Sequence, residues 1–239
     1  MKVLLAVVAV LCTFEASLSQ DYHVTPLVGG VSGTGKTTRY WDCCKPSCSW
    51  KANLKSKSGK PVEACAADGK TVVKESTKSA CEEGAGAYMC SDQQPKVVNS
   101  TFALGYVAAS FTGGIDVNMC CACLRLKFQG DLSGKQMIVQ VTNTGSDLGS
   151  NQFDIAIPGG GVGIFTKGCS SQWGTPSNGW GDQYGGVSSE SQCSQLPSSL
   201  REGCKFRFTF MKSVSNPAVT FEQVSCPSEI VSASGCNYS

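Results

Sequence analysis

One acidic residue, Asp42, stands among aromatic and cysteine residues in a short segment between positions 38 and 50. A carboxyl group can act as a general acid, a general base or a nucleophile, and aromatic faces stack on the C–H faces of sugar rings. By composition alone, the segment equally fits a structural role in which Tyr40, Trp41 and Trp50 belong to the core and Asp42 caps a loop. Hydrolysis of a glycosidic bond would need a second carboxyl group.

The other common catalytic groups are scarce in this chain. It has a single histidine, His23, whereas serine–histidine triads, cysteine–histidine pairs and His-based zinc sites all need a positioned imidazole. Residues 30–37 match the phosphate-loop pattern G-x-x-x-x-G-K-[ST], but that motif works only between a buried strand and a helix. We interpret residues 20–37 as a flexible lead-in, and we expect carboxyl groups to carry any catalysis.

The chain begins with a segment that resembles a secretory signal peptide. A positive charge at Lys2 precedes an apolar run over residues 3–11, and the small residues Ser17 and Ser19 follow. We expect cleavage near Ser19–Gln20, so residues 1–19 are assigned to the signal and the protein is expected to be secreted and extracellular. N-glycosylation sequons at Asn99 and Asn237 are consistent with export.

Cysteine usage also indicates an oxidising compartment. Of fifteen cysteines, Cys12 lies in the signal, and the fourteen that remain allow up to seven disulfides. Adjacent cysteines make poor zinc co-ligands, so no metal or other cofactor is expected. Disulfide geometry also prevents neighbours from pairing with each other. The doublets at 43–44 and 120–121 should therefore each tie the chain to two different places.

The charge balance is nearly even, with 20 basic and 18 acidic residues. Such a chain offers no broad basic face for nucleic acid or anionic lipid, so we expect a neutral ligand and neither a nucleic-acid nor a membrane partner. We also expect a monomer. Alternating or β-rich runs predict strands at residues 70–74, 124–128, 137–142, 153–157, 205–210 and 219–224. A short helix is expected at 104–109. Many short strands among Gly-rich turns favour an all-β barrel, with residues 38–239 as one domain.

Four segments together resemble glycoside hydrolase family 45, the small endoglucanases. They are the T-R-Y-W-D-C-C-K-P-S-C-S-W run at 38–50, the cluster Cys120-Cys121-Ala122-Cys123, residues 145–165 with F-D-x-x-I-P-G-G-G, and residues 223–227. The similarity covers residues 38–236. It implies a six-stranded double-psi β-barrel with long disulfide-stapled loops and an open substrate groove.

The resemblance implies a role for each of three acids. Asp42 matches the general base that activates water, Asp154 matches the general acid that protonates the leaving oxygen, and Asp147 matches a third acid that assists. Three further positions match substrate contacts: Tyr40, Lys45 and Trp50. One departure is Gln152, which stands where the fungal members carry histidine, so the pH dependence near Asp154 is expected to differ.

The family's disulfide framework would pair the fourteen cysteines in seven bonds. These are Cys43–Cys169, Cys44–Cys81, Cys48–Cys120, Cys65–Cys90, Cys121–Cys236, Cys123–Cys226 and Cys193–Cys204.

The activity that the resemblance implies is hydrolysis of internal β-1,4-glucosidic bonds of cellulose and related glucans, with inversion. One alternative is a β-1,4-glucanase that prefers xyloglucan or glucomannan, which would use the same acids. Another is a non-hydrolytic expansin-like wall-loosening protein, which keeps an acid like Asp154 but lacks the base. The presence of Asp42 therefore favours hydrolysis.

Overall fold

The computed structural model describes residues 24–56, 59–82, 86–114, 117–145 and 147–238. The signal peptide expected at residues 1–19 and the histidine His23 lie outside these ranges. Among the described residues, no helix has the length and apolar character needed to cross a membrane.

The chain forms nine strands and three α-helices over its described ranges. The strands are β1 (Ser32–Tyr40), β2 (Ala64–Cys65), β3 (Tyr88–Met89), β4 (Lys96–Val97), β5 (Phe102–Ser110), β6 (Cys123–Phe128), β7 (Gln136–Thr144), β8 (Gln152–Ala156) and β9 (Ala218–Val224). The helices are α1 (Lys167–Trp173), α2 (Arg201–Thr209) and α3 (Ser228–Ser234). Short 3-10 turns lie at Ser47–Ser49, Lys51–Asn53, Val117–Met119, Gly130–Leu132, Glu190–Gln195 and Ser198–Leu200.

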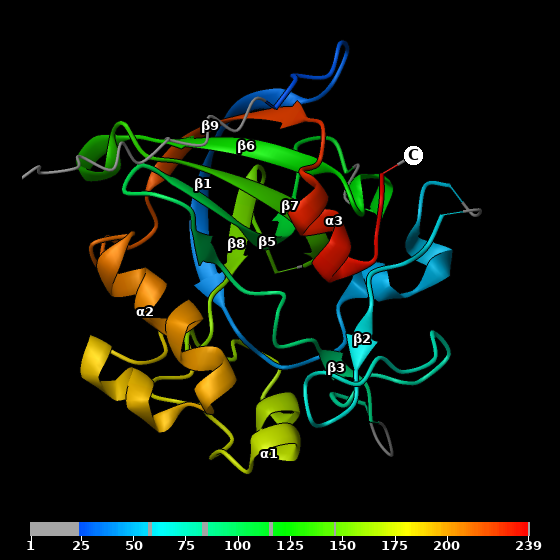
Figure 1. The fold of residues 1–239 in the computed structure, drawn as a ribbon, viewed down its shortest axis with the longest axis vertical. Coiled ribbons are helices and arrows are strands. Elements are labelled where there is room, and N and C mark those ends of the chain that lie inside the picture. The colour runs from blue at the N-terminus through cyan, green and yellow to red at the C-terminus, as the bar shows by residue number, and fades with distance from the viewer. Residues whose placement is uncertain (1–23, 57–58, 83–85, 115–116, 146, 239) are drawn as a thin grey trace, which may run out of the picture.

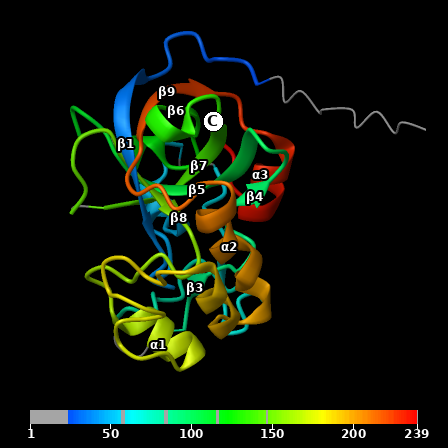
Figure 2. The ribbon, with the colours of Figure 1, turned by 90° about the vertical axis from the view of Figure 1, so that its left-hand side faces the viewer.

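Six strands make a closed barrel, as the resemblance implies. Their order is β5-β7-β6-β9-β1-β8, and β8 closes the ring by pairing with β5. The pairs β1–β8 and β5–β7 are parallel, whereas the other pairs in the ring are antiparallel. In Figure 1 the barrel fills the upper part of the molecule, while α1, α2 and the antiparallel pair β2–β3 lie below it. Figure 2 shows the same division from the side.

The barrel interior is packed with aromatic and aliphatic side chains. Phe111, Phe153 and Phe221 meet edge to face, with ring centroids 4.9 to 6.2 Å apart. Buried side chains from β6 and β7 complete this core. Large aromatic rings contribute much of the buried apolar area of a core, so this cluster fills the centre of the barrel. The side chains on the opposite face of each strand point away from it.

The prediction that residues 20–37 form a flexible lead-in is wrong in part, because residues 32–37 belong to β1, a strand of the barrel. The glycines that suggested a mobile segment are needed for packing. A Cβ atom at Gly35 would lie 2.2 Å from the Asn151 carbonyl oxygen, and one at Gly33 would press on the Phe221 ring. A strand with no helix after it also rules out the phosphate-loop reading of this segment.

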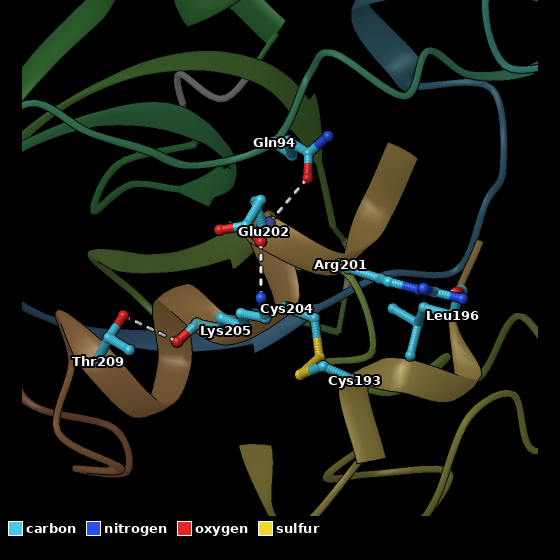
Figure 3. A network of polar contacts seen from close by, with 9 residues as sticks. Gln94, Cys193, Leu196, Arg201, Glu202, Cys204, Lys205 and Thr209 are labelled. Carbon is cyan, nitrogen blue, oxygen red and sulfur yellow. Dashed lines mark hydrogen bonds and ion pairs between the residues drawn. A yellow bond between two sulfur atoms is a disulfide. The ribbon is translucent and has the colours of Figure 1, made fainter. Parts of the chain in front are cut away.

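Two of the expected elements are of the wrong type. Residues 104–109 belong to β5, which is buried along its whole length, and a continuous apolar run does not distinguish a buried strand from a helix. Residues 205–210 fall in and just after α2 rather than in a strand. Phe206 and Phe210, one helical turn apart, stack with ring centroids 5.1 Å apart. Figure 3 shows α2 held by the Cys193–Cys204 disulfide and an ion pair between Glu202 and Lys205.

The expected strand at residues 70–74 is reduced to an isolated bridge between Val72 and Cys65. The Asp68 carboxylate accepts hydrogen bonds from the backbone of Lys70 and Thr71, which fixes a turn at this point. The expected strands at 124–128, 137–142 and 219–224 are confirmed within β6, β7 and β9, and the strand at 153–157 lies in β8 apart from its last residue.

Seven disulfides occur within the described chain, and they use all fourteen cysteines that follow the expected signal. The pairs are Cys43–Cys169, Cys44–Cys81, Cys48–Cys120, Cys65–Cys90, Cys121–Cys236, Cys123–Cys226 and Cys193–Cys204. These are the pairs that the resemblance implies, and both doublets split between two partners. Such a dense set of disulfides is typical of extracellular proteins.

Candidate active site

Successive side chains of β8 point to opposite faces of the strand, and Asp154 lies on the face that points away from the barrel core. Phe153 and Ile155 are fully buried on the inner face, so Gln152 and Asp154 share the other face. Asp154 pairs with Thr38 of β1 on one side and with Ala108 of β5 on the other. The small side chain of Ala108 leaves room beside the carboxyl group, where the lining of a surface pocket begins.

Asp42 follows the end of β1 and is held by the local backbone. Its carboxylate oxygen Oδ1 accepts a hydrogen bond of 2.9 Å from the Cys44 N–H, and Cys43 between them has a left-handed φ of 61°. The Cys43–Cys169 disulfide ties this turn to α1. Gly168 packs so closely that a Cβ atom there would lie 2.3 Å from the Asp42 carbonyl oxygen. The turn therefore has little freedom to move the carboxyl group.

One pocket brings together the three acids expected from the sequence. Asp42, Asp147 and Asp154 line it, together with residues from the ends of β1 and β7 and from the Gly-rich loop after β8. These other lining residues are Tyr40, Ala108, Asn143, Thr144, Gly145, Leu148, Val162, Gly163, Ile164 and Phe165. A larger pocket, of about 280 Å³, lies beside the antiparallel pair β2–β3 and contains none of the three acids.

The carboxyl group of Asp154 is set up to hold a proton near neutral pH. Burial is the main cause that raises its pKa, to about 7, and the charges of Asp42 and Asp147 raise it further. A hydrogen bond from the Thr38 hydroxyl and the charge of Arg39 act in the opposite direction. Within the described chain, the buried Asp154 Oδ1 accepts no hydrogen bond, which leaves its negative charge poorly solvated.

Asp42 is also buried, but its surroundings favour the anion more. Burial raises its pKa to about 6, while the hydrogen bond from the Cys44 N–H lowers it. The charge of Asp147 contributes a smaller increase. Two carboxyl groups in one pocket with different hydrogen-bond surroundings can divide the roles of acid and base between them.

Tyr40 lies in the same pocket, where the sequence placed it. Its hydroxyl accepts a hydrogen bond of 3.4 Å from the Asn143 amide, and burial raises its pKa well above the usual value. Asn143 in turn accepts a 2.8 Å hydrogen bond from the Ser47 N–H. Sequence analysis missed Asn143 and Thr144. Earlier positions of the same strand are polar too, so polarity gives these two residues only a weak signal as part of a site.

Lys45 and Trp50 are not brought into the pocket with the acids. The Lys45 ammonium donates to the backbone carbonyls of Glu75 and Thr77 and lies 3.2 Å from the centroid of the Trp50 ring. Lys45 is not among the groups that shift the pKa of Asp42. The hydrogen bond from the Cys44 N–H is the contact that favours the ionised form of Asp42.

Exposed apolar side chains border the pocket on the side of the Gly-rich loop. Ile164 and Phe165 are each about half exposed, at 52% and 50%, and Tyr184 is 76% exposed on a neighbouring loop. The two loops are joined by reciprocal hydrogen bonds between Gly163 and Gln183. These exposed rings beside the pocket are a feature that sequence analysis did not single out.

A closed barrel whose open pocket is lined by buried carboxyl groups fits a glycoside hydrolase, a reaction that needs a pair of carboxyl groups. Comparison with known proteins gives the same class. The sequence profile of glycosyl hydrolase family 45 matches residues 34–237, and the chain belongs to this family.

Similarity to individual family members extends over most of the chain. The chain is 54% identical to an endoglucanase of Phaedon cochleariae, over 99% of each of the two sequences. It is 53% identical to an endoglucanase of Cryptopygus antarcticus, over 87% of this chain and 91% of the relative. The crystal structure of a cellulase from that Antarctic springtail superposes with a TM-score of 0.82 at 52% identity, over 87% of this chain and 99% of the other.

Proposed function

We propose that this protein is an inverting endo-β-1,4-glucanase in which Asp154 is the general acid and Asp42 is the general base. The observation that carries the proposal is the pair of buried carboxyl groups in one open pocket, with different hydrogen-bond surroundings. Asp42 receives a backbone N–H, which suits an ionised base. Asp154 has a buried oxygen with no partner in the described chain, which suits a protonated acid.

The proposed reaction is a single displacement at the anomeric carbon. Asp154 gives its proton to the glycosidic oxygen as the bond from that oxygen to C1 breaks. Asp42 takes a proton from a water molecule whose oxygen bonds to C1 from the opposite face. This geometry calls for carboxyl groups about 6.5–9.5 Å apart, and it releases a product of α configuration.

The proposed substrate is the β-1,4-glucan backbone of cellulose and related polysaccharides. The named relatives are endoglucanases and a cellulase, and the exposed rings at the pocket edge suit a neutral glucan chain. A preference for xyloglucan or glucomannan would use the same acids and differ in loop contacts. An expansin-like protein is the less favoured alternative, because Asp42 supplies the base that such proteins lack.

The endo mode of attack is tested by following viscosity and reducing ends together. With a soluble, neutral β-1,4-glucan, internal cleavage is expected to lower the viscosity steeply while few reducing ends have appeared. Parallel assays on xyloglucan and glucomannan rank the three backbones. A viscosity that falls only in proportion to reducing sugar would contradict internal cleavage, and a loss of viscosity without reducing sugar would indicate the non-hydrolytic alternative.

Asp147 is proposed to tune the two catalytic acids without itself transferring a proton. Its charge contributes to the raised pKa of Asp42, which is about 6, and to that of Asp154, which is about 7. Activity needs an ionised Asp42 and a protonated Asp154, so the enzyme should be most active between about pH 6 and about pH 7. Asp147→Asn is expected to lower both pKa values and to move both limbs of the pH–rate profile to lower pH, with reduced turnover at pH 7. Profiles of kcat/KM against pH measure this directly.

A matched control for this variant is Asp131→Asn, which removes one exposed charge before β7, at the end of that strand opposite to the pocket. Its profile is expected to coincide with that of the unaltered protein. If Asp147→Asn also left the profile and the turnover unchanged, Asp147 would have only a turn-capping role.

We also propose that the protein is secreted after cleavage near Ser19–Gln20 and that residues 38–239 form one catalytic domain, active as a monomer. The dense disulfide framework and the family of the chain support the extracellular assignment.

A further inference from the structure

The carboxyl group of Asp154 is connected to the turn before β8 through two side chains. The Gly149 N–H donates a hydrogen bond of 3.0 Å to Gln152 Oε1, and Gln152 Nε2 donates one of 3.0 Å to Thr38 Oγ1. Thr38 lies beside Asp154 across the parallel strands, and its hydroxyl acts as a donor that lowers the pKa of the Asp154 carboxyl group. The parallel register of β1 and β8, in which Thr38 pairs with Asp154, aligns the two side chains.

This chain of hydrogen bonds has only one possible direction. A backbone N–H can only donate, so Gly149 must face the carbonyl oxygen of the Gln152 amide. The amide NH₂ then points to Thr38, whose oxygen accepts. The Thr38 hydroxyl proton is therefore left to be donated to Asp154. A donor held against one carboxyl oxygen stabilises the anion and leaves the other oxygen to carry the acid's own proton.

We propose that Gln152 is a positioning residue that acts through Thr38 to fix which oxygen of Asp154 carries the transferable proton and how firmly it is held. The inference rests on the proposed role of Asp154 as the general acid. A neutral amide performs this task by geometry alone, because it adds no charge to the pocket. It also couples Asp154 to the backbone of the turn that contains Asp147.

The hydrogen-bond chain acts within a field set by charged neighbours. Burial and the charges of Asp42 and Asp147 raise the pKa of Asp154, and Arg39 lowers it. β5 presents the uncharged Ala108 on its side. Five ionisable groups therefore surround Asp154 and Gln152: Lys36, Arg39, Tyr40, Asp42 and Asp147. Substituting Gln152 or Thr38 with an uncharged residue leaves all five in place, so a change in pH dependence reports on the hydrogen bonds.

The test compares the pH dependence of kcat/KM for Gln152→Leu, Thr38→Val and the double variant on a soluble β-1,4-glucan. Loss of the donor to Asp154 raises the pKa of the acid. The basic limb should therefore move to higher pH, by about half a unit for Gln152→Leu and about one unit for Thr38→Val. The double variant should show no more shift than Thr38→Val, because Gln152 acts through Thr38.

Two further variants make the result decisive. Gln152→Met keeps the length of the side chain, removes its hydrogen bonds and adds no charge, so its basic limb should move upward about as far as that of Gln152→Leu. This variant carries the test if Gln152→Leu does not fold. Thr37→Val is the control, because Thr37 is buried on the other face of β1 and donates to the Pro217 carbonyl. Its basic limb should not move.

Two results would overturn the inference: basic limbs that stay in place in both Gln152 variants, or a double variant whose shift equals the sum of the two single shifts. This failure is distinguishable from failure of the proposed function. If Asp154→Asn abolishes turnover while the Gln152 variants leave the basic limb unmoved, only the positioning role is wrong. If Asp154→Asn keeps its turnover, the assignment of the acid itself is wrong.

Discussion

Asp154→Asn is expected to lower kcat on a soluble β-1,4-glucan by about 10²–10⁴-fold while leaving the fold intact. An amide cannot supply the proton that the departing glycosidic oxygen needs. The size of the loss should depend on the leaving group. An aryl β-cellobioside with an acidic phenol leaves without protonation, so the variant should recover most of its turnover on that substrate. Steady-state rates on the two substrates measure the difference.

The same substitution should stabilise the protein above neutral pH. The pKa of Asp154 is about 7 in the folded chain and about 3.9 when unfolded, so the folded state binds more protons between these values. Stability of the unaltered protein therefore falls as pH rises from about 4 to about 7, and Asp154→Asn removes this loss. Its Tm should exceed that of the unaltered protein by a few degrees at pH 8 and by nothing at pH 4. An equal Tm difference at both pH values would show that Asp154 is not buried as described.

Asp42→Asn is expected to lower kcat by a similar factor of about 10²–10⁴, but with a different dependence on the leaving group. Without a base, water is not activated, and an acidic phenol does not replace that function. The variant should therefore remain slow on both the polysaccharide and the aryl substrate. Thermal unfolding of the same preparation checks that the turn at Cys43 and Cys44 survives.

The comparison between the two variants separates the two roles. Asp131→Asn, whose charge lies at the far end of β7 from the pocket, serves as the shared control and should retain full turnover on both substrates. Recovery of Asp42→Asn on the aryl substrate, with none for Asp154→Asn, would mean that the roles of acid and base are reversed.

The resemblance predicted the six-stranded barrel, and it named three acids that the structure brings into one pocket. The catalytic roles of these acids remain a proposal. Asp42 and Asp154 lie in long, specific motifs, and the alternation of β8 turns Asp154 away from the buried Phe153 and Ile155. Their meeting in one pocket, however, depends on the parallel pairing of β1 with β8, which no local pattern encodes. Residues that complete the pocket from elsewhere, such as Asn143, carry only a weak local signal.

Errors in the predicted elements arose where tertiary contacts override local pattern. The glycines of β1 suggested a mobile segment, but at position 35 the Asn151 carbonyl lies so close that only glycine fits. Phe206, Phe208 and Phe210 alternate as in a strand, but they lie on a helix held by the Cys193–Cys204 disulfide. Lys45, which matches a substrate contact of the family, donates hydrogen bonds from its ammonium group to the backbone carbonyls of Glu75 and Thr77.

The most direct test of the account is the configuration of the first product. Proton NMR spectra recorded within the first minutes of cello-oligosaccharide hydrolysis distinguish the two anomers before mutarotation mixes them. The account predicts that the α anomer appears first, because the water activated by Asp42 attacks from the face opposite to the oxygen protonated by Asp154. Initial release of the β anomer would mean retention through a covalent intermediate, and it would contradict the assignment of Asp42 as a base.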